Sequence, residues 1–320
     1  MAENKDAAGG LFTEEHLASF HRDGYVVIEG VLSDSEVDSA RQTFHDDLKT
    51  IGIDHGGIFA GTSVAPPECA IKSAVADIYY SKWKLLGVHL NPRVVSAIRA
   101  LLNATFLAPL SSGSYPGPAT TIALPDILAY IDRVCYRLPN AIRNEKGLDL
   151  HLDRHPTLPF AHIKKWRPIQ AFVTLTDHWG GSTGGLQVVP GFHRKIDEYF
   201  AKGPEIKDAA GEFYRMTDHS HDRLRKDLVT VQAPKGSLVC WDNRVAHATC
   251  SRLTGRDSRE VVFVGFLPDV EVNRAYVREQ YRCMLRGLSP PAYDAVPVRG
   301  PDWKPDDLSE EQRRMLGFPS

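Results

Sequence analysis

The chain has 320 residues, of which 42% are hydrophobic and 24% charged. This composition is typical of a globular protein with a substantial core and argues against wholesale disorder. The formal net charge of -2 at pH 7 gives no long-range attraction for nucleic acid or an anionic membrane surface. We therefore expect neither as a partner, and a small molecule instead.

The five cysteines are scattered and contain no C-x-x-C pair, so neither a disulfide framework nor a zinc ribbon is indicated. The first ten residues are polar and small, and no apolar run is long enough for a membrane span. We expect a cytoplasmic protein, monomeric or homodimeric. Residues 1–10 are predicted to be a flexible lead and residues 11–320 a single domain.

The N-terminal third is predicted to be mainly helical. Thr13 opens a short helix that Gly24 ends, and a second helix follows the capping box formed by Ser33 and Glu36. Residues 50–72 show no periodicity and are predicted to be a long loop. Two more helices are predicted from the stretches SAVADIYYSKWKLLGVHL (73–90) and NPRVVSAIRALLN (91–103).

From about residue 124 the pattern changes to short β-branched or aromatic runs separated by Gly, Pro, Asp or Asn. These runs are ILAYIDRVCYRL, DLHLD, IQAFVTLTD, LQVVPG, LVTVQA, GSLVCW and EVVFVGFL. Many short strands indicate a sandwich or a barrel. The fold class predicted is thus mainly β with a helical N-terminal third and a Pro-rich C-terminal extension at about 268–320, which ends in a helix.

The triplet His-x-Asp occurs three times, starting at His21, His45 and His151. The first two copies lie in predicted helices, where positions two apart point in very different directions, so we expect solvated surface groups there. His151 and Asp153 lie in a strand-like stretch, where positions two apart share a face. This pair has the geometry of a chelate, although hydrogen-bonded His/Asp pairs without metal are also common.

A third ligand would favour the metal, and the best candidate is His247, which follows a predicted strand and a polar turn. Two imidazoles and one carboxylate form a ligand set that suits non-haem Fe(II) and leaves positions open for substrate and O2. Arg259 begins the next apolar strand and can point toward the same cavity. A guanidinium there is suited to bidentate capture of a carboxylate.

The chain resembles the phytanoyl-CoA dioxygenase family of Fe(II)- and 2-oxoglutarate-dependent oxygenases. The resemblance is carried by His151-x-Asp153 and Arg259, and by stretches spread in family order over residues 11–267. These stretches are FHRDGYVVIEGVLS, IQAFVTLTD, STGGLQVVPGFHR, PKGSLVCWDNRVAHATC and EVVFVGF. Phe192 stands where the family usually has Ser, which leaves the expected metal ligands intact.

The resemblance implies a catalytic domain with a double-stranded β-helix (jelly-roll, cupin-like) core. It implies His151, Asp153 and His247 as catalytic iron ligands, with Fe(II), 2-oxoglutarate and O2 as cofactor and cosubstrates. Arg259 would bind the far carboxylate of 2-oxoglutarate, with Thr249 beside it. Tyr136 and Arg137 would line the substrate or cosubstrate site. The implied reaction is hydroxylation of a small organic metabolite with release of succinate and CO2, and desaturation or cyclisation stays open.

Two other classes stay open on the residues alone. A zinc-type hydrolase or isomerase could use the same three ligands without needing Arg259, and a jelly-roll binding module could keep the fold without catalysis. Substrate specificity is expected in loops, at residues 50–72, 108–124 and 195–228. Nothing in the sequence indicates a CoA ester in particular.

Overall fold

The computed structural model describes residues 10–66, 74–106, 126–154, 156, 164–202, 206, 209–210 and 213–319. Two antiparallel sheets of six strands each organise these residues. In spatial order the larger sheet consists of β1 (Tyr25–Ile28), β10 (Leu238–Asp242), β5 (Ile169–Thr174), β12 (Arg259–Pro268), β3 (Ile127–Arg137) and β2 (Val75–Ala76). The smaller sheet consists of β7 (Ala209–Ala210), β8 (Phe213–Arg215), β4 (His151–Leu152), β11 (His247–Thr249), β6 (Leu186–Val188) and β9 (Val229–Thr230).

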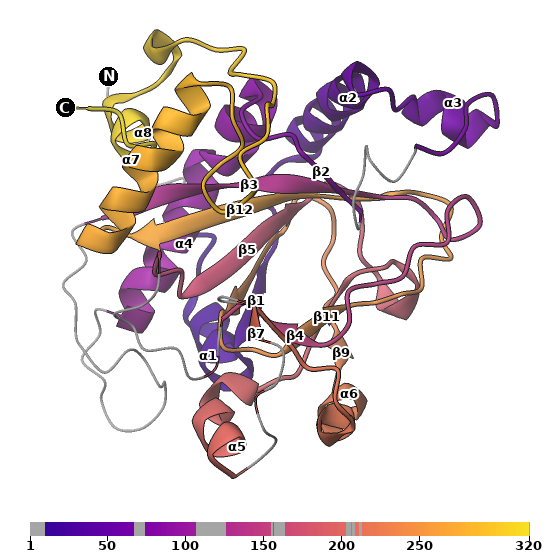
Figure 1. The fold of residues 1–320 in the computed structure, drawn as a ribbon, viewed down its shortest axis with the longest axis vertical. Helices are drawn as coiled ribbons and strands as arrows, with labels where there is room; N and C mark the ends of the chain where they lie inside the picture. The colour runs from indigo at the N-terminus through magenta and orange to yellow at the C-terminus, as the bar shows by residue number, and fades with distance from the viewer. Residues whose placement is uncertain are drawn as a thin grey trace.

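Helices surround these sheets. The α-helices are α1 (Glu14–Asp23), α2 (Asp34–Thr50), α3 (His55–Ala60), α4 (Pro92–Phe106), α5 (Ile196–Lys202), α6 (Asp222–Lys226), α7 (Glu271–Leu285) and α8 (Glu310–Met315). A π-helix spans Trp83–His89, and 3-10 turns span Gly180–Ser182, Phe192–Arg194, His219–His221 and Pro305–Asp307. Figure 1 shows α7 and α8 at one end of the long strands β3 and β12, and α2 and α3 at the other end.

The expected helix starts are confirmed by their caps. The Thr13 side chain accepts a hydrogen bond from the His16 backbone N–H, and Gly24 ends α1 in the left-handed conformation. Ser33 and Glu36 form the reciprocal capping box of α2. Local chemistry alone fixes these boundaries.

The helix predicted over 73–90 is wrong in its first half. Val75 and Ala76 pair with Cys135 and Val134 as an edge strand, and only Trp83–His89 is helical. Pairing with a neighbouring strand overrides the local propensity there. The loop predicted over 50–72 contains α3, which Asp54 caps, and the Pro-rich extension contains the long helix α7.

The larger sheet has one face on a helix-covered core and the other on a cavity. On β3, Val134 and Tyr136 belong to the core packed against the helices, whereas Cys135 and Arg137 line the cavity. A β-bulge interrupts this alternation, because Val262 pairs with Val134 but Val264 pairs with Ile131. Asp132 and Arg133, in the bulge, consequently both line the cavity.

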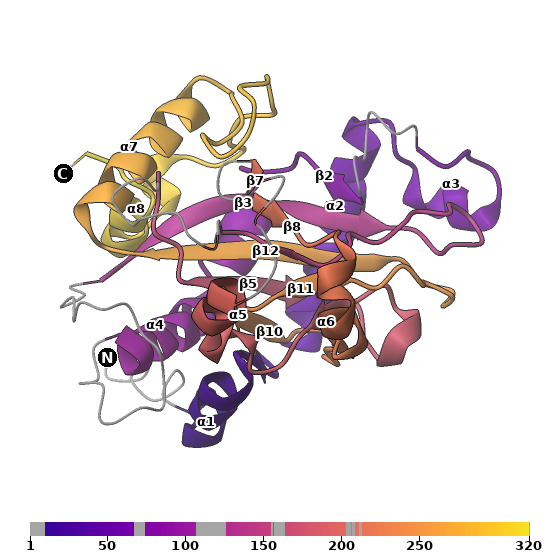
Figure 2. The same ribbon diagram turned by 60° about the horizontal axis from the view of Figure 1, so that its bottom comes forward.

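The smaller sheet supplies the opposite wall of the cavity. Its strand β11 lies between β4 and β6, and His247 pairs directly with His151 of β4. Directly paired residues of antiparallel strands carry their side chains on the same face, with Cβ atoms about 5 Å apart. Figure 2 shows β8 and β11 next to the larger sheet, with α5 and α6 beyond them.

Candidate active site

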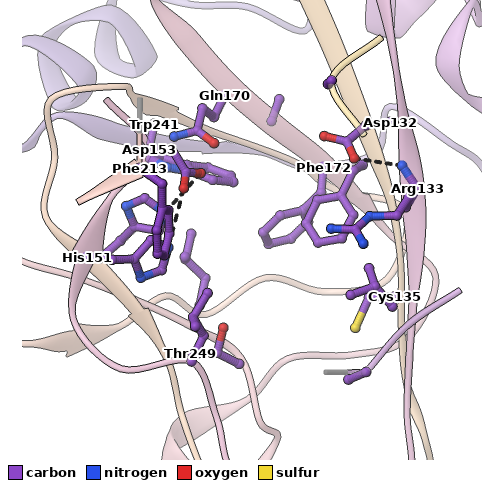
Figure 3. Close-up of a pocket in the computed structure, with 18 of the residues that line it drawn as sticks. Asp132, Arg133, Cys135, His151, Asp153, Gln170, Phe172, Phe213, Trp241 and Thr249 are labelled. Carbon is purple, nitrogen blue, oxygen red and sulfur yellow. Dashed lines mark hydrogen bonds and ion pairs between the residues drawn. The ribbon is translucent and has the colours of Figure 1, made fainter. Parts of the chain in front are cut away.

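A cavity of about 640 Å³ lies between the two sheets. Figure 3 shows His151 and Asp153 on one side of it and Asp132, Arg133 and Cys135 on the other. Aromatic rings from both sheets and from the segment after α7 cover part of the wall, namely those of Tyr130, Phe172, Phe213, Trp241, Phe263 and Tyr293. The volume is within the range of small-molecule sites.

The structure brings the three predicted ligands together in this cavity. One donor atom from each of His151, Asp153 and His247 lies within 4.8 Å of the other two. The Nε2 atoms of His151 and His247 are each 3.7 Å from a different oxygen of the Asp153 carboxylate. These separations exceed hydrogen-bond lengths, so the three groups surround a point rather than bonding to one another.

Backbone carbonyls orient both imidazoles. The Nδ1–H of His151 can donate to the Asp149 carbonyl at 2.7 Å, and that of His247 to the Val245 carbonyl at 2.9 Å. This bond selects the tautomer whose Nε2 lone pair faces Asp153, which is the orientation that ligating histidines have in metal sites. Each histidine carries its own orienting contact two residues upstream.

The electrostatic surroundings favour, for His151 and Asp153, the protonation states that can bind a metal ion. Burial, with a smaller effect of His247, lowers the pKa of His151 to about 4, so the imidazole is neutral at pH 7. Burial raises the pKa of Asp153, but His247, His151 and Arg167 outweigh burial and hold the pKa well below its ordinary value. A neutral imidazole and an ionised carboxylate are the forms that bind a metal ion.

Arg259 lies in the same cavity, at the start of β12, and is 6% exposed. Its Nη1 donates to Cys135 Sγ at 3.2 Å, and its guanidinium carbon lies 5.6 Å from the centre of the Phe172 ring. Its Nε is buried without a partner, and within the described residues no carboxylate pairs with it. A buried guanidinium without an anion has strong unsatisfied donors, which a bound carboxylate would satisfy.

Thr249 and Arg137 also line the cavity, but their donors differ in availability. Thr249 follows His247 by two positions on β11 and shares its face. Arg137 already donates to four backbone carbonyls, those of Gly184, Glu145, Cys250 and Ser251. Arg137 thus ties three loops together and has little capacity left for a ligand.

The structure does not place Tyr136 in this site. Its side chain lies on the opposite face of β3, where the hydroxyl is 2.8 Å from His55 Nδ1. The reason is the alternation of the strand, which turns neighbouring residues to opposite faces. The expectation that Tyr136 contacts substrate or cosubstrate is therefore withdrawn.

The other two His-x-Asp triplets, which start at His21 and His45, lie outside the cavity, and their side chains are not fully solvated. Asp47 is buried and accepts hydrogen bonds from Ser81 Oγ and Trp83 Nε1, at 2.6 and 2.7 Å. His45 lies against the buried Glu260 at 2.9 Å. In the first triplet His21 and Asp23 are both partly buried, and Asp23 pairs with the exposed Arg22, so neither triplet is the fully solvated pair that was expected.

Sequence reasoning expected Trp241 at the border of the cavity but missed Arg167 and Phe213. Arg167 Nη2 is 3.8 Å from Asp153 and its Nη1 is 3.7 Å from Asp132. The rings of Phe213 and Trp241 are centred 5.1 and 5.5 Å from those of His151 and His247, respectively. No motif marks Arg167 or Phe213, since each comes from a different segment than the ligand it contacts, whereas Trp241 precedes His247 by six residues in the same segment.

Comparison with known proteins finds a partial match to one family and several solved structures with a similar fold. A model of the Gig2-like family matches residues 161–316, somewhat less than half of the chain. The crystal structure of GlcNAc Inducible Gene 2, GIG2 (DUF1479), from Candida albicans has a TM-score of 0.69 and 16% identity, over 95% of this chain and 76% of that one. No curated protein matches the chain.

Two further solved structures share the fold. A hypothetical protein from Escherichia coli has a TM-score of 0.71 and 20% identity, over 97% of this chain and 83% of that one. The non-heme alpha ketoglutarate dependent carbocyclase SnoK from nogalamycin biosynthesis has a TM-score of 0.51 and 17% identity, over 83% and 87%. At these identities the likeness shows the fold alone.

The family model that matches is the Gig2-like one and not that of the phytanoyl-CoA dioxygenase family, so the narrower resemblance stays a prediction. Among the helices that the structure describes, none has the length and apolar character needed to cross a bilayer. The expected monomer or homodimer and the expected cytoplasmic location are tested by neither observation.

Proposed function

We propose that this protein is a non-haem Fe(II)- and 2-oxoglutarate-dependent dioxygenase with a double-stranded β-helix core, acting on a small organic metabolite. One observation carries the proposal. Two imidazoles and a carboxylate converge around one point, and a buried guanidinium without a carboxylate partner among the described residues lines the same cavity. A zinc hydrolase would need the three converging ligands but not the buried guanidinium of Arg259.

The residues of the chain divide the work of such a site. His151, Asp153 and His247 would hold the ion from one side, which leaves its remaining coordination positions facing the cavity. Bound Fe(II), together with 2-oxoglutarate and O2, supplies oxidative decarboxylation to succinate and CO2 coupled to oxidation of a C–H bond. Arg259 would bind the far carboxylate of 2-oxoglutarate in bidentate fashion, with the Thr249 hydroxyl beside it.

Arg167 would position the carboxylate ligand. Its Nη2 lies 3.8 Å from Asp153 and, after His247 and His151, its charge also favours the ionised carboxylate. The aromatic rings that line the cavity would limit the access of water to a bound ion.

The comparisons support this proposal at the level of fold. The SnoK carbocyclase, which is alpha ketoglutarate dependent, shares the arrangement of this chain at a TM-score of 0.51. We place the chain with the Gig2-like proteins on the match over residues 161–316 and on the likeness to GIG2. The iron ligands and the hydroxylation outcome are our own assignment.

The test is turnover of 2-oxoglutarate by purified protein with Fe(II) and ascorbate. Slow succinate formation is expected even without substrate, and His151→Ala should abolish it, because a two-ligand site holds the ion poorly. Equal succinate from wild type and His151→Ala would refute the assignment. Screening metabolites for faster succinate formation, with mass spectrometry for the gain of one oxygen, would then identify the substrate.

A further inference from the structure

The cavity is far more basic than the chain that forms it. The chain has a formal charge of -2, yet among the described residues the cavity is lined by seven lysines and arginines and only two acidic residues, Asp132 and Asp153. The basic residues are Arg133, Arg137, Lys146, Lys165, Arg167, Arg215 and Arg259. A cavity lined by one sign of charge concentrates ligands of the opposite sign.

Four of these seven cations are already engaged by other groups or by the proposed cosubstrate. Arg167 lies between the two acidic residues, at 3.7 and 3.8 Å. Arg137 donates to backbone carbonyls, and Arg259 would take the cosubstrate. Lys165 lies over the Tyr130 and Tyr276 rings, at 5.6 and 5.7 Å. Arg133, Lys146 and Arg215 have no carboxylate partner within the described residues.

Arg133 is the best placed of the three. The β-bulge of β3 turns it to the cavity, and its guanidinium carbon lies 4.5 Å from the centre of the Tyr293 ring. Figure 3 shows the guanidinium extending inward on the wall opposite His151. Its Nε is buried without a partner, and Asp132 Oδ1 accepts instead from the Arg133 backbone N–H and from the Tyr293 hydroxyl.

Arg215 lies on the side of the metal ligands. On β8 it pairs directly with His151, and its guanidinium carbon is 5.7 Å from the centre of the Phe213 ring. Phe213 and Arg215 share the face of β8 that lines the cavity, whereas Tyr214 between them is in a hydrophobic cluster. Arg215 and Lys146 are exposed, so they form the outer, hydrated part of the basic wall.

We propose that the substrate is an anion, with a carboxylate or phosphate group bound by Arg133 and attracted by Arg215 and Lys146, and an apolar part against the rings of Phe213 and Tyr293. A guanidinium that is partly withdrawn from water gains most from a charged, bidentate partner. That this ligand is the substrate rests on the proposed oxygenase function. That the cavity binds an anion does not.

The test measures binding of fluorescent probes to the full-length protein, with and without Zn(II) and saturating 2-oxoglutarate. The probes are 1-naphthyl phosphate, 1-naphthoate and the uncharged 1-naphthol. At least one anionic probe should bind tenfold or more tightly than 1-naphthol, and the tighter of the two anions identifies the group. Equal affinity for all three probes would overturn the proposal.

Variants locate the anion. Arg133→Gln should weaken the binding of the favoured anionic probe at least tenfold and leave the binding of 1-naphthol unchanged. Arg133→Lys, which keeps the charge, should recover part of the affinity and also exclude a folding defect. Arg215→Gln should cause a smaller loss that disappears at high salt, because that residue is exposed. Arg223→Gln, the same change on the exposed face of α6, should have no effect. Full anion affinity in Arg133→Gln contradicts the proposal.

The two proposals fail in different ways. If the protein never forms succinate but the anionic probe depends on Arg133, the oxygenase function falls and the anion site stands. If succinate forms and depends on His151 while the probes do not distinguish charge, the anion site alone falls. Arg259→Gln should weaken the binding of 2-oxoglutarate without weakening the binding of the naphthyl probe. This result would distinguish the cosubstrate site at Arg259 from the anion site at Arg133.

Discussion

Among the described residues, two clusters each contain two histidines and one carboxylate, and only one of the two has the properties of a metal site. The first is the cavity cluster, His151, Asp153 and His247. The second is the helix-side cluster, His45, His55 and Glu260, on the helix-covered face of the larger sheet. In each, one donor atom per residue lies within 4.8 Å of the others. By composition and spacing of donors the two are alike.

Their hydrogen bonds differ. Glu260 accepts from Arg41 Nε at 2.9 Å and from Ser258 Oγ at 2.5 Å, and it lies 2.9 Å from His45 Nε2. His55 Nδ1 contacts the Tyr136 hydroxyl, and the two imidazole rings are stacked 3.7 Å apart. The carboxylate oxygens of Glu260 already accept these hydrogen bonds, and the charge of Glu260 is already balanced by a cation, Arg41.

In the cavity cluster the hydrogen bonds leave the Nε2 atoms and the carboxylate available. Backbone carbonyls occupy the Nδ1 atoms, and both Nε2 atoms stay beyond hydrogen-bond distance of Asp153. A set of donors can thus bind a metal when neighbouring groups hold its lone pairs toward one common point next to a cavity. The helix-side cluster is instead an ion pair that joins α2 to β12.

The largest expected difference between the clusters is in metal affinity. Titration with Co(II), followed by its visible absorption, should show one site per chain in wild type. His247→Ala should weaken it by more than about 100-fold, since loss of a ligand exceeds the 10- to 100-fold typical of an outer-shell partner. His55→Ala, the matched change in the helix-side cluster, should leave the affinity unchanged. Equal losses of affinity in both variants would show that the two clusters do not differ in metal binding.

The next effect concerns the two arginines associated with these clusters. Arg259→Gln should raise the concentration of 2-oxoglutarate required for half-maximal binding at least tenfold, because a charged bidentate contact contributes about 1.5 to 3 kcal/mol. Binding can be followed anaerobically by calorimetry on the Zn(II)-loaded protein. Arg41→Gln, which removes the partner of Glu260, should leave 2-oxoglutarate binding intact. A 2-oxoglutarate affinity insensitive to Arg259 would favour a zinc hydrolase or a binding module.

The smallest effect is on stability and its dependence on pH. Burial, and next the charge of His45, lower the pKa of His55 from 6.5 to about 4. The unfolded chain therefore binds this proton first, and stability falls as the pH drops from about 6.5 to 4. Burial raises the pKa of Glu260, but His45 and Arg41 outweigh it and lower the pKa from 4.5 to about 2. Glu260 thus adds a second loss between about pH 4.5 and 2.

Urea unfolding at several pH values measures this dependence. Glu260→Gln should lower the free energy of unfolding at pH 7 by about 2 kcal/mol, because Arg41 and His45 lose a charged acceptor. It should also flatten the acid limb below pH 4.5. His55→Asn should flatten the limb between pH 6.5 and 4. An acid limb that keeps its slope in both variants would show that other groups control it.

Local patterns predicted much of the framework. The caps at Thr13 and Ser33 set the starts of α1 and α2, and the β-branched runs predicted strands β3, β5, β10 and β12. These features depend on interactions within a few residues, so they are legible without the fold. The missed edge strand β2 and helix α3 are short elements whose stability comes from remote partners.

For the site, the chain itself determined which residues can act. His151-x-Asp153 in an extended stretch can present both donors to one face, although β4 itself ends at Leu152, and His247 and Arg259 lie in β runs that face inward every second residue. Only the tertiary structure decided which histidines meet, which face Tyr136 and Arg137 take, and that His45 finds Glu260. Those outcomes depend on strand register and on the bulge in β3, which are set by packing between segments about 100 to 140 residues apart.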